Sequence, residues 1–427
     1  MHDTAVREKA FLVLVHDHRE KWPVEVLTQE FKVLVDSAGI EVVDILIVKL
    51  RQINSALYLG KGKVEELAAA VMGADVNVVI FNNNLNARQQ HNLEDIFKVK
   101  TIDRTQLILD IFARHAHSQE GILQVELAQL QYLLPRLKGK GVEMSRLGGG
   151  IGTRGPGEKK LEIDRRRITD RVTRLQGELL RVISQREVMR KKRQKEKTIL
   201  CSLVGYTSAG KTTLFNALTQ ANEKTDPSLF TTLDTVARAF EVSDNMSALI
   251  SDTVGFIHHL PLQLVEAFKA TLEELHHSDL LLHVLDASSP DAGLLLDSVN
   301  DVLEDLKLSA KPLLLVFNKI DLIGDADLSR LKRDYPDSVF VSALRGDNLV
   351  GLKSRIYQVL FPDMAEVVLK FPFSRMEVVA DIHQYCQVIK TAYNDDQVLC
   401  WVRVPRDKLF YLQKKGLTVN ELGRQEI

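Results

Sequence analysis

One short segment constrains the fold of this chain more than any other. The residues Gly205–Thr212 (GYTSAGKT) follow an apolar run, TILCSLV, and precede a helical stretch, LFNALTQA. A GxxxxGK[ST] pattern between a strand and a helix is typical of a phosphate-binding loop, whose backbone N–H groups wrap phosphates. We therefore expect a doubly wound α/β domain here, with Lys211 at the β/γ-phosphate oxygens and Thr212 available to Mg²⁺.

Three further motifs follow in order, each at the carboxyl end of an expected strand. Asp252–Gly255 offers a carboxylate to Mg²⁺ through water and a Gly255 N–H to a γ-phosphate. Asn318–Asp321 ends in a carboxylate that can accept both N1–H and N2–H of guanine, which adenine lacks. Ser342-Ala343 offers a backbone N–H to guanine O6. This order predicts a site for GTP or GDP and disfavours a metabolic ATPase. The expected nucleotide contacts are Gly205, Tyr206, Thr207, Ser208, Ala209, Gly210, Lys211, Thr212, Thr213, Phe230, Thr232, Asp252, Gly255, Asn318, Lys319, Asp321, Ser342 and Ala343.

Among the residues expected near the γ-phosphate, the usual catalytic glutamine is missing. In the segment LFTTLDT (229–235), Thr232 is expected to reach Mg²⁺ and the γ-phosphate, although a threonine pair is also ordinary strand composition. Many GTPases have a water-orienting glutamine where this chain has Phe256, which cannot hydrogen-bond to water. No catalytic residue is assigned, and His258 and His259 are interpreted as mobile loop residues. We expect Mg²⁺-dependent hydrolysis that is slow until a partner, a cation or a backbone group completes the site. The expected metal ligands are Thr212, Thr232 and, through water, Asp252.

The expected P-loop domain spans residues 198–361. The sequence pattern divides the rest of the chain into three further regions. Residues 1–110 alternate β-branched runs with helical stretches, which predicts an α/β domain with a largely parallel sheet. Residues 111–197 contain two helical stretches around a glycine-dense segment, GGGIGTRGPGE, and predict an antiparallel helical hairpin with a glycine-rich tip loop. Residues 362–427 predict a small α+β domain, in which two strands flank a helix-like segment from Val378 to Tyr393. The fold class is therefore multidomain α/β.

The second hairpin helix is strongly basic. From Lys159 to Lys197 there are fifteen Lys and Arg against six Asp and Glu. Such a run is usually a solvated helix face, but its apolar residues recur three or four apart and leave the arginines on the other side. The adjoining glycine-rich loop could approach a crowded RNA surface. The residues expected to bind RNA are Arg146, Arg154, Arg165, Arg166 and Arg167.

Composition sets the remaining limits. The three cysteines have no metal-ligand spacing, and no apolar run reaches the ~18 residues of a membrane span. The apolar run near the start is too short for a signal peptide. We therefore expect a cytoplasmic monomer without a membrane span. The tetrapeptide Gly60–Lys63 is compatible with a second anion or nucleotide site and also with a simple surface turn.

The motifs together resemble the HflX family of translation-associated GTPases. The resemblance is carried by IDRTQLILDIFARHAHSQEGILQVELAQL (102–130), by GGGIGTRGPGEKKLEIDRRRI (148–168) and by DTVGFIHHLP (252–261), phenylalanine included. It covers most of the chain and weakens after Pro362. The family commonly has asparagine where Ser208 stands. Because that asparagine helps to bind K⁺ in related GTPases, the serine speaks against stimulation by K⁺.

The resemblance implies a cytoplasmic GTPase that binds the large ribosomal subunit, with its hairpin directed towards the peptidyl-transferase region. It implies hydrolysis stimulated by the ribosome and, in some members, splitting or rescue of stalled ribosomes under stress. Two alternatives stay open: a GTPase acting in ribosome assembly or RNA remodelling, and a nucleotide-gated binding protein whose hydrolysis is incidental.

Overall fold

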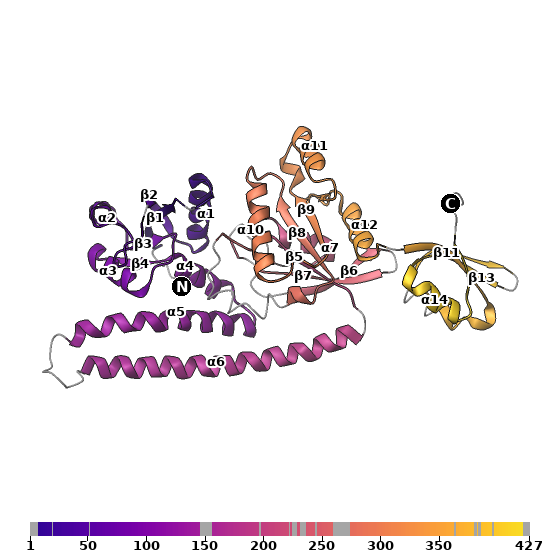
Figure 1. The fold of residues 1–427 in the computed structure, drawn as a ribbon, viewed down its shortest axis with the longest axis horizontal. Coiled ribbons are helices and arrows are strands. Elements are labelled where there is room, and N and C mark those ends of the chain that lie inside the picture. The colour runs from indigo at the N-terminus through magenta and orange to yellow at the C-terminus, as the bar shows by residue number, and fades with distance from the viewer. Residues whose placement is uncertain are drawn as a thin grey trace, which may run out of the picture.

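The chain is an elongated arrangement of four structural units (Figure 1). The computed structural model describes residues 7–18, 20–50, 52–145, 156–195, 198–221, 223, 229–230, 236–243, 246–258, 274–362, 364–379, 382, 386–394 and 397–421. An N-terminal α/β unit and a P-loop unit lie side by side, and a long helical hairpin runs beneath them. A small C-terminal unit lies at the far end. This arrangement matches the expected multidomain α/β class.

The N-terminal unit is built on a four-stranded parallel sheet in the order β2-β1-β3-β4. The apolar runs of the inner strands β1 and β3 are buried on both faces, as is usual in parallel sheets, whereas β2 is an edge strand and is only partly buried. One face is covered by α1 and α4, and the other by α2 and α3. The strands are β1 (Lys9–Asp17), β2 (Glu41–Leu50), β3 (Val78–Phe81) and β4 (Lys100–Ile102). The helices are α1 (Val24–Ser37), α2 (Lys61–Gly73), α3 (Ala87–Phe97) and α4 (Arg104–His115). The expected parallel sheet is confirmed.

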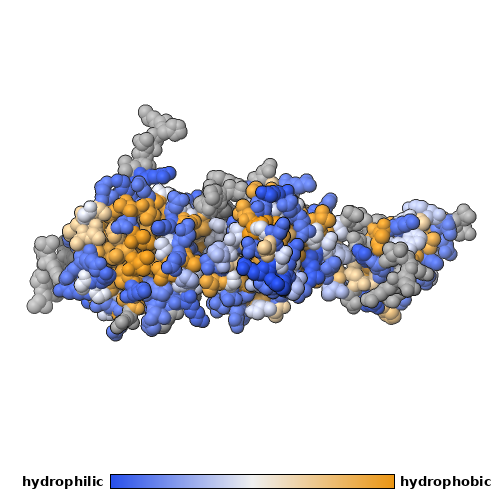
Figure 2. Space-filling view, turned by 90° about the horizontal axis from the view of Figure 1, so that it is seen from above, coloured by the Kyte–Doolittle hydropathy of each residue, from blue (hydrophilic) through white to orange (hydrophobic). Residues whose placement is uncertain are grey.

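Two surface features of this unit are also visible. Apolar residues gather on it when the molecule is seen from above (Figure 2), and the edge strand β2 exposes Val43 and Ile47. The turn at Gly60 begins α2, and the ammonium group of Lys63 lies 2.6 Å from the Glu66 carboxylate. Gly60–Lys63 thus forms the first turn of α2 and not a separate surface turn, and Lys63 is paired with a carboxylate of the same helix.

The hairpin consists of α5 (Gln119–Ser145) and α6 (Pro156–Lys195), which lie antiparallel (Figure 1). Leu123 and Leu127 of α5 pack against Leu175 of α6, and the guanidinium of Arg171 forms two hydrogen bonds of 2.7 Å with Glu126. The expected seam therefore forms. Most of the glycine-rich tip, with Arg146 and Arg154, lies outside the described residues.

The P-loop unit contains a six-stranded sheet in the order β10-β9-β8-β5-β7-β6, parallel except for β6. The strands are β5 (Leu200–Val204), β6 (Val236–Ser243), β7 (Met246–Asp252), β8 (Leu280–Asp286), β9 (Leu313–Asn318) and β10 (Val339–Phe340). The helices are α7 (Lys211–Thr219), α10 (Ala292–Asp305), α11 (Asp325–Asp334) and α12 (Leu349–Leu360), with a 3-10 turn at Ile320–Leu322. The strand order reverses next to β5, and ligands bind at such points in doubly wound sheets.

The C-terminal unit is an antiparallel sheet in the order β12-β13-β11-β14, with α14 packed against it. The elements are β11 (Met364–Pro372), a 3-10 turn (Phe373–Arg375), β12 (Gln387–Asn394), β13 (Gln397–Pro405), α14 (Arg406–Lys414) and β14 (Thr418–Glu421). The expectation of a helix-like segment up to Tyr393 is wrong. Residues 387–394 are a strand, because β-branched and aromatic residues such as Val388, Thr391 and Tyr393 favour pairing with β13.

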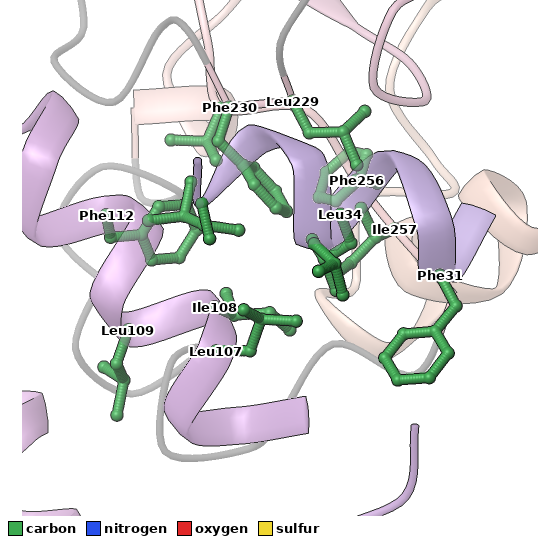
Figure 3. Packing of buried hydrophobic residues seen from close by; sticks show 14 of the residues in the cluster. Phe31, Leu34, Leu107, Ile108, Leu109, Phe112, Leu229, Phe230, Phe256 and Ile257 are labelled. Carbon is green, nitrogen blue, oxygen red and sulfur yellow. The ribbon is translucent and has the colours of Figure 1, made fainter. Parts of the chain in front are cut away.

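The N-terminal and P-loop units share one hydrophobic core. Phe31 and Leu34 of α1 and Ile108 and Phe112 of α4 join residues of the P-loop unit in a single buried cluster (Figure 3). The P-loop residues include Leu229, Phe230, Phe256 and Ile257. Among the helices that the structure describes, none is both long and apolar enough to cross a membrane.

Candidate guanine-nucleotide site

The phosphate loop, Gly205–Thr212, joins β5 to α7 in a conformation that requires glycine at two positions. Gly205 has φ +150° and Gly210 has φ +88°. A Cβ on Gly205 would lie 2.3 Å from the Val284 carbonyl oxygen, and a Cβ on Gly210 would lie 2.3 Å from the Asn318 amide nitrogen. Any side chain at either position would therefore displace a neighbouring strand or the base-recognition loop.

Lys211 is held inside this loop. Its side chain is buried, and Nζ donates hydrogen bonds to the carbonyl oxygens of Tyr206 (2.7 Å) and Gly205 (3.2 Å). Burial lowers the pKa of Lys211 to about 8, although the Asp252 carboxylate acts in the opposite direction. The ammonium group is thus a desolvated cation that can exchange two carbonyl contacts for phosphate oxygens.

The oxygen groups expected to hold a metal ion come together beside the loop. Thr212 Oγ1 donates a hydrogen bond of 2.7 Å to a carboxylate oxygen of Asp252, at the end of β7. A hydroxyl and a carboxylate are hard oxygen donors of the kind that Mg²⁺ prefers, so these residues fit the ion. Thr232 lies outside the described residues.

The base-recognition motifs meet at the same end of the sheet. The Asn318 amide donates to the Ala209 carbonyl (3.0 Å) and its oxygen accepts the Ala343 N–H (3.0 Å), which ties three motifs together. Asp321 accepts a hydrogen bond of 2.6 Å from Ser342 Oγ, which fixes its carboxylate. Motifs that are far apart in the sequence therefore lie together in one continuous site.

Two charged residues near the base-recognition loop were missed by sequence reasoning. The carboxylate of Asp286, at the end of β8, lies 2.6 Å from Lys319 Nζ. The guanidinium of Arg345 lies 3.9 Å from the Asp321 carboxylate. Asp286 carried a usable signal because it is an acidic residue at the carboxyl end of a buried strand.

The last residue of β7 and the loop after it, together called the loop 252–258, lie against the phosphate loop. The N–H of Thr207 donates to the Phe256 carbonyl (2.9 Å), and the N–H of Phe256 donates to the Gly205 carbonyl (3.1 Å). A Cβ on Gly255 would lie 2.8 Å from Thr207 Cγ2 and 3.0 Å from Lys211 Nζ. Glycine is therefore required for this close approach, and Gly255 sits beside the lysine that is expected to meet the γ-phosphate.

Phe256 and His258 both pack against the N-terminal unit. The side chain of Phe256 is 2% exposed and belongs to the shared core, so the position has a packing role (Figure 3). The expectation that His258 is a mobile loop residue is wrong. Its ring stacks on Trp22 with centroids 4.3 Å apart, and its Nε2 lies 3.1 Å from Glu20. His259 lies outside the described residues.

The remaining candidate residues are placed as follows. Phe230 was expected to contact the nucleotide, but its side chain packs edge-on against Phe112 with ring centroids 4.6 Å apart. Ser208 is exposed in the phosphate loop with φ +60°, and Thr213 is half-buried in the first turn of α7. The expected RNA contacts Arg165, Arg166 and Arg167 are exposed on α6. The structure thus brings the phosphate and base motifs together and leaves Phe230 turned into the shared core.

Three family models match the chain in succession. A model described as "GTP-binding GTPase N-terminal" matches residues 25–113, and one described as "GTP-binding GTPase Middle Region" matches residues 115–193. A model described as "50S ribosome-binding GTPase" matches residues 200–319.

Curated relatives match over nearly the whole chain. The GTPase HflX of Caldanaerobacter subterraneus is 44% identical over 389 residues, which cover 91% of this chain and 89% of the relative. The GTPase HflX of Escherichia coli is 40% identical over 401 residues, which cover 93% of this chain and 94% of the relative.

Solved structures of a GTP-binding protein are also similar. One is a complex of SsGBP with GDP, at 26% identity and a TM-score of 0.45, covering 83% of this chain and 98% of that one. Another is a GTP-binding protein from Sulfolobus solfataricus with GDP, at 27% identity and a TM-score of 0.43, with the same coverage.

Proposed function

This chain belongs to the HflX GTPase family, and we propose that it is a Mg²⁺-dependent GTP hydrolase activated by the large ribosomal subunit. It acts in the cytoplasm as a monomer, and it splits or rescues stalled ribosomes under stress. The observation that carries this proposal is that one chain brings its phosphate and base-recognition motifs together in one site and exposes three consecutive arginines on its hairpin. The description "50S ribosome-binding GTPase" of the family model over residues 200–319 supports the choice of partner.

The nucleotide site supports GTP as the substrate. Asp321 is oriented by Ser342, and Asn318 joins the base-recognition loop to the phosphate loop. Lys211 provides a cation for the phosphates, and Thr212 and Asp252 are the residues that would hold Mg²⁺. When bound, the ion would neutralise charge on the β- and γ-phosphate oxygens.

The burial of Phe256 supports slow intrinsic hydrolysis. A water that attacks the γ-phosphate must be oriented by a hydrogen-bonding group, and the side chain at this position is apolar and turned into the shared core. A group from outside the chain can supply that function, in the way that activating partners supply a stabilising residue to other GTPases. The exposed arginines of the hairpin favour the ribosome as this partner.

The hairpin supports contact with ribosomal RNA. Its seam holds one side of α6 against α5, while Arg165, Arg166 and Arg167 are exposed to solvent. Consecutive exposed arginines suit phosphate groups, and RNA helices are recognised largely through shape and backbone. Binding of this kind weakens as salt is raised, because counterions are released on contact.

Binding to purified large subunits tests the RNA contact. Arg165→Ala, Arg166→Ala and Arg167→Ala together should weaken co-sedimentation with the subunits at least several-fold and leave GDP affinity unchanged. A matched control replaces Arg330, Lys332 and Arg333, three exposed cations on α11, with alanine. Equal loss in both variants would show that total charge, and not the hairpin, determines binding. Binding confined to assembly intermediates would favour the ribosome-assembly alternative.

A further inference from the structure

The start of α4 contacts both the loop 252–258 and the hairpin. Asp103 and Arg104 are neighbours in the chain, and both side chains are buried. Arg104 faces the P-loop unit, whereas Asp103 faces α5. These two residues belong to no nucleotide motif and have no part in the proposed RNA contact.

Arg104 holds the loop 252–258 through a compact polar network. Its guanidinium donates a hydrogen bond of 2.9 Å to the His258 carbonyl and forms an ion pair with Glu30 of α1. Glu30 also accepts a hydrogen bond from the hydroxyl of Tyr206, which belongs to the phosphate loop. The same hydroxyl accepts the N–H of His258 at 2.7 Å. One network therefore joins α1, α4, the phosphate loop and the loop after β7.

Aromatic packing reinforces this contact. Trp22 stacks on the His258 ring with centroids 4.3 Å apart and on the Tyr206 ring at 6.0 Å. Phe256 and Ile257, which precede His258, are buried in the shared core beside α1 (Figure 3). The three consecutive residues 256–258 thus all pack against the N-terminal unit.

Asp103 fixes the hairpin to the same unit. Its carboxylate accepts hydrogen bonds from the Tyr132 hydroxyl (2.8 Å) and from Arg136 (3.1 Å), both on α5. It also accepts the N–H groups of Leu85 (3.0 Å) and Gln106 (2.9 Å), the second of which caps α4. Arg136 adds a hydrogen bond of 2.7 Å to the Leu85 carbonyl and lies over the Tyr132 ring. Buried, multiply bonded groups of this kind have one well-defined arrangement.

A γ-phosphate would disturb the loop that Arg104 holds. Lys211 Nζ is bonded to two carbonyls of its own loop, and Gly255 lies close against it. The backbone of Phe256 is bonded to the phosphate loop through both its N–H and its carbonyl. A γ-phosphate at Lys211 would compete with the two carbonyl bonds of that lysine, and Gly255 lies close enough to Lys211 to meet the same phosphate. Because residues 256–258 follow Gly255 directly, we expect them to move when Gly255 moves.

We propose that Asp103 and Arg104 are positioning residues that couple the nucleotide state to the placement of the hairpin. Arg104 transmits movement of residues 256–258 to the N-terminal unit, and Asp103 makes α5 follow that unit. The inference rests on the proposed function only in that GTP and GDP are the ligands that switch the loop. By linkage, whatever binds the hairpin must bias the nucleotide site to the same extent.

Distances between units in the full-length protein test this coupling. Spin labels are placed at the exposed positions Met72 in α2, Ile163 in α6 and Val350 in α12, while the native cysteines are buried. In the parent protein the 72–350 distance should differ between GDP and a non-hydrolysable GTP analogue, and the 72–163 distance should stay constant. Arg104→Gln should abolish the difference in the 72–350 distance.

Variants that affect the Arg104 contacts and variants that affect the Asp103 contacts should change different distances. Tyr132→Phe removes one hydrogen bond to Asp103, and it should broaden the 72–163 distance while leaving the 72–350 response intact. Arg88→Gln, at an exposed arginine of α3, serves as the control and should change neither. If Arg104→Gln does not fold, Arg104→Lys keeps the charge but lacks the planar fork, and it should also reduce the response.

Binding to large subunits provides a second readout. Any preference of the subunits for the GTP form over the GDP form, typically ~5–150-fold for a coupled system, should fall towards one in Arg104→Gln. A parent-like distance response in both Arg104 variants, or no nucleotide-dependent distance in the parent protein, would overturn the coupling. The distance experiment contains no ribosomes. A failure of ribosome-stimulated hydrolysis would therefore count against the proposed function and would leave the test of the coupling unaffected.

Discussion

At the scale of single residues, the most informative position is Phe256. By sequence it occupies the place of a catalytic glutamine, and in the structure its ring fills part of the core that joins two units. Phenylalanine in place of glutamine has two effects: the nucleotide site lacks a hydrogen-bonding group at this position, and the shared core gains an aromatic ring. We therefore propose that this position links hydrolysis to the contact between the N-terminal and P-loop units.

Phe256→Gln should not create a faster GTPase. The change leaves a cavity and buries an amide, at a cost of about 3–5 kcal/mol, so the midpoint of thermal unfolding should fall by several degrees. Intrinsic GTP hydrolysis should not rise in single-turnover measurements. Phe256→Leu, which stays apolar, should lose less stability. A clear increase in hydrolysis by the glutamine variant would mean that the side chain can reach the nucleotide.

Nucleotide affinity should depend on pH through Lys211. The pKa of this lysine is about 8 in the free protein, and phosphate oxygens favour its charged form and so raise it. Affinity for GDP should therefore be full below pH 8 and fall as the pH rises above it, by at most about tenfold per pH unit. Calorimetry between pH 7 and pH 9 measures this slope. Lys211→Arg, which stays charged, should show a flat profile, and a flat profile in the parent protein would contradict the assigned environment.

Base selection should rest on Asp321. Asp321→Asn replaces one acceptor with a donor, so GTP binding should weaken at least tenfold and xanthosine triphosphate, which has a carbonyl at that edge, should bind better. Competition between the two nucleotides measures the change. Retained preference for guanine would place base recognition elsewhere.

These residues also show how far the sequence predicts the site. The phosphate and base motifs could be placed, because each follows an apolar run that becomes a parallel strand and such strands end at one edge. Phe230 and His258 could not be placed, because their partners Phe112 and Trp22 lie in another unit. Local patterns carry no information about which distant apolar face a loop will meet.

At the scale of elements, periodicity was a good guide to the hairpin and a poor one to β12. The apolar residues of α5 and α6 recur at helical spacing over long stretches, so both helices and their seam could be predicted. The segment 387–394 is short, and a bulge at Val388–Lys390 interrupts the alternation that would have marked a strand. Pairing with β13 decides its structure, and a neighbouring strand is a tertiary effect.

The hairpin seam should depend on Leu175 more than on any exposed leucine of the same helix. Leu175 is fully buried between α5 and α6, so Leu175→Ala should destabilise the hairpin by about 2–5 kcal/mol. Hydrogen exchange of the amides of α5 and α6 should become faster. Leu180, which is 66% exposed, provides the control, and Leu180→Ala should have almost no effect. Equal effects of the two changes would contradict the assigned seam.

At the scale of the whole molecule, the nucleotide site and the hairpin belong to one connected structure. The shared core joins the P-loop unit to the N-terminal unit, and Asp103 joins that unit to α5. The sequence predicted the separate units and their classes from their strand and helix patterns. It could not predict the shared core, because the residues that form it look like ordinary amphipathic helix faces and loop residues when each is considered alone.

We propose that a large ribosomal subunit completes the GTPase site. Steady-state hydrolysis of GTP, with ATP as the control nucleotide, should be measured with and without purified large subunits at two salt concentrations. We predict slow hydrolysis by the protein alone and strong stimulation by the subunits that is specific to GTP and weaker at the higher salt. Absence of stimulation at both salt concentrations, while GTP still binds, would show that the large subunit is not the partner that completes this site.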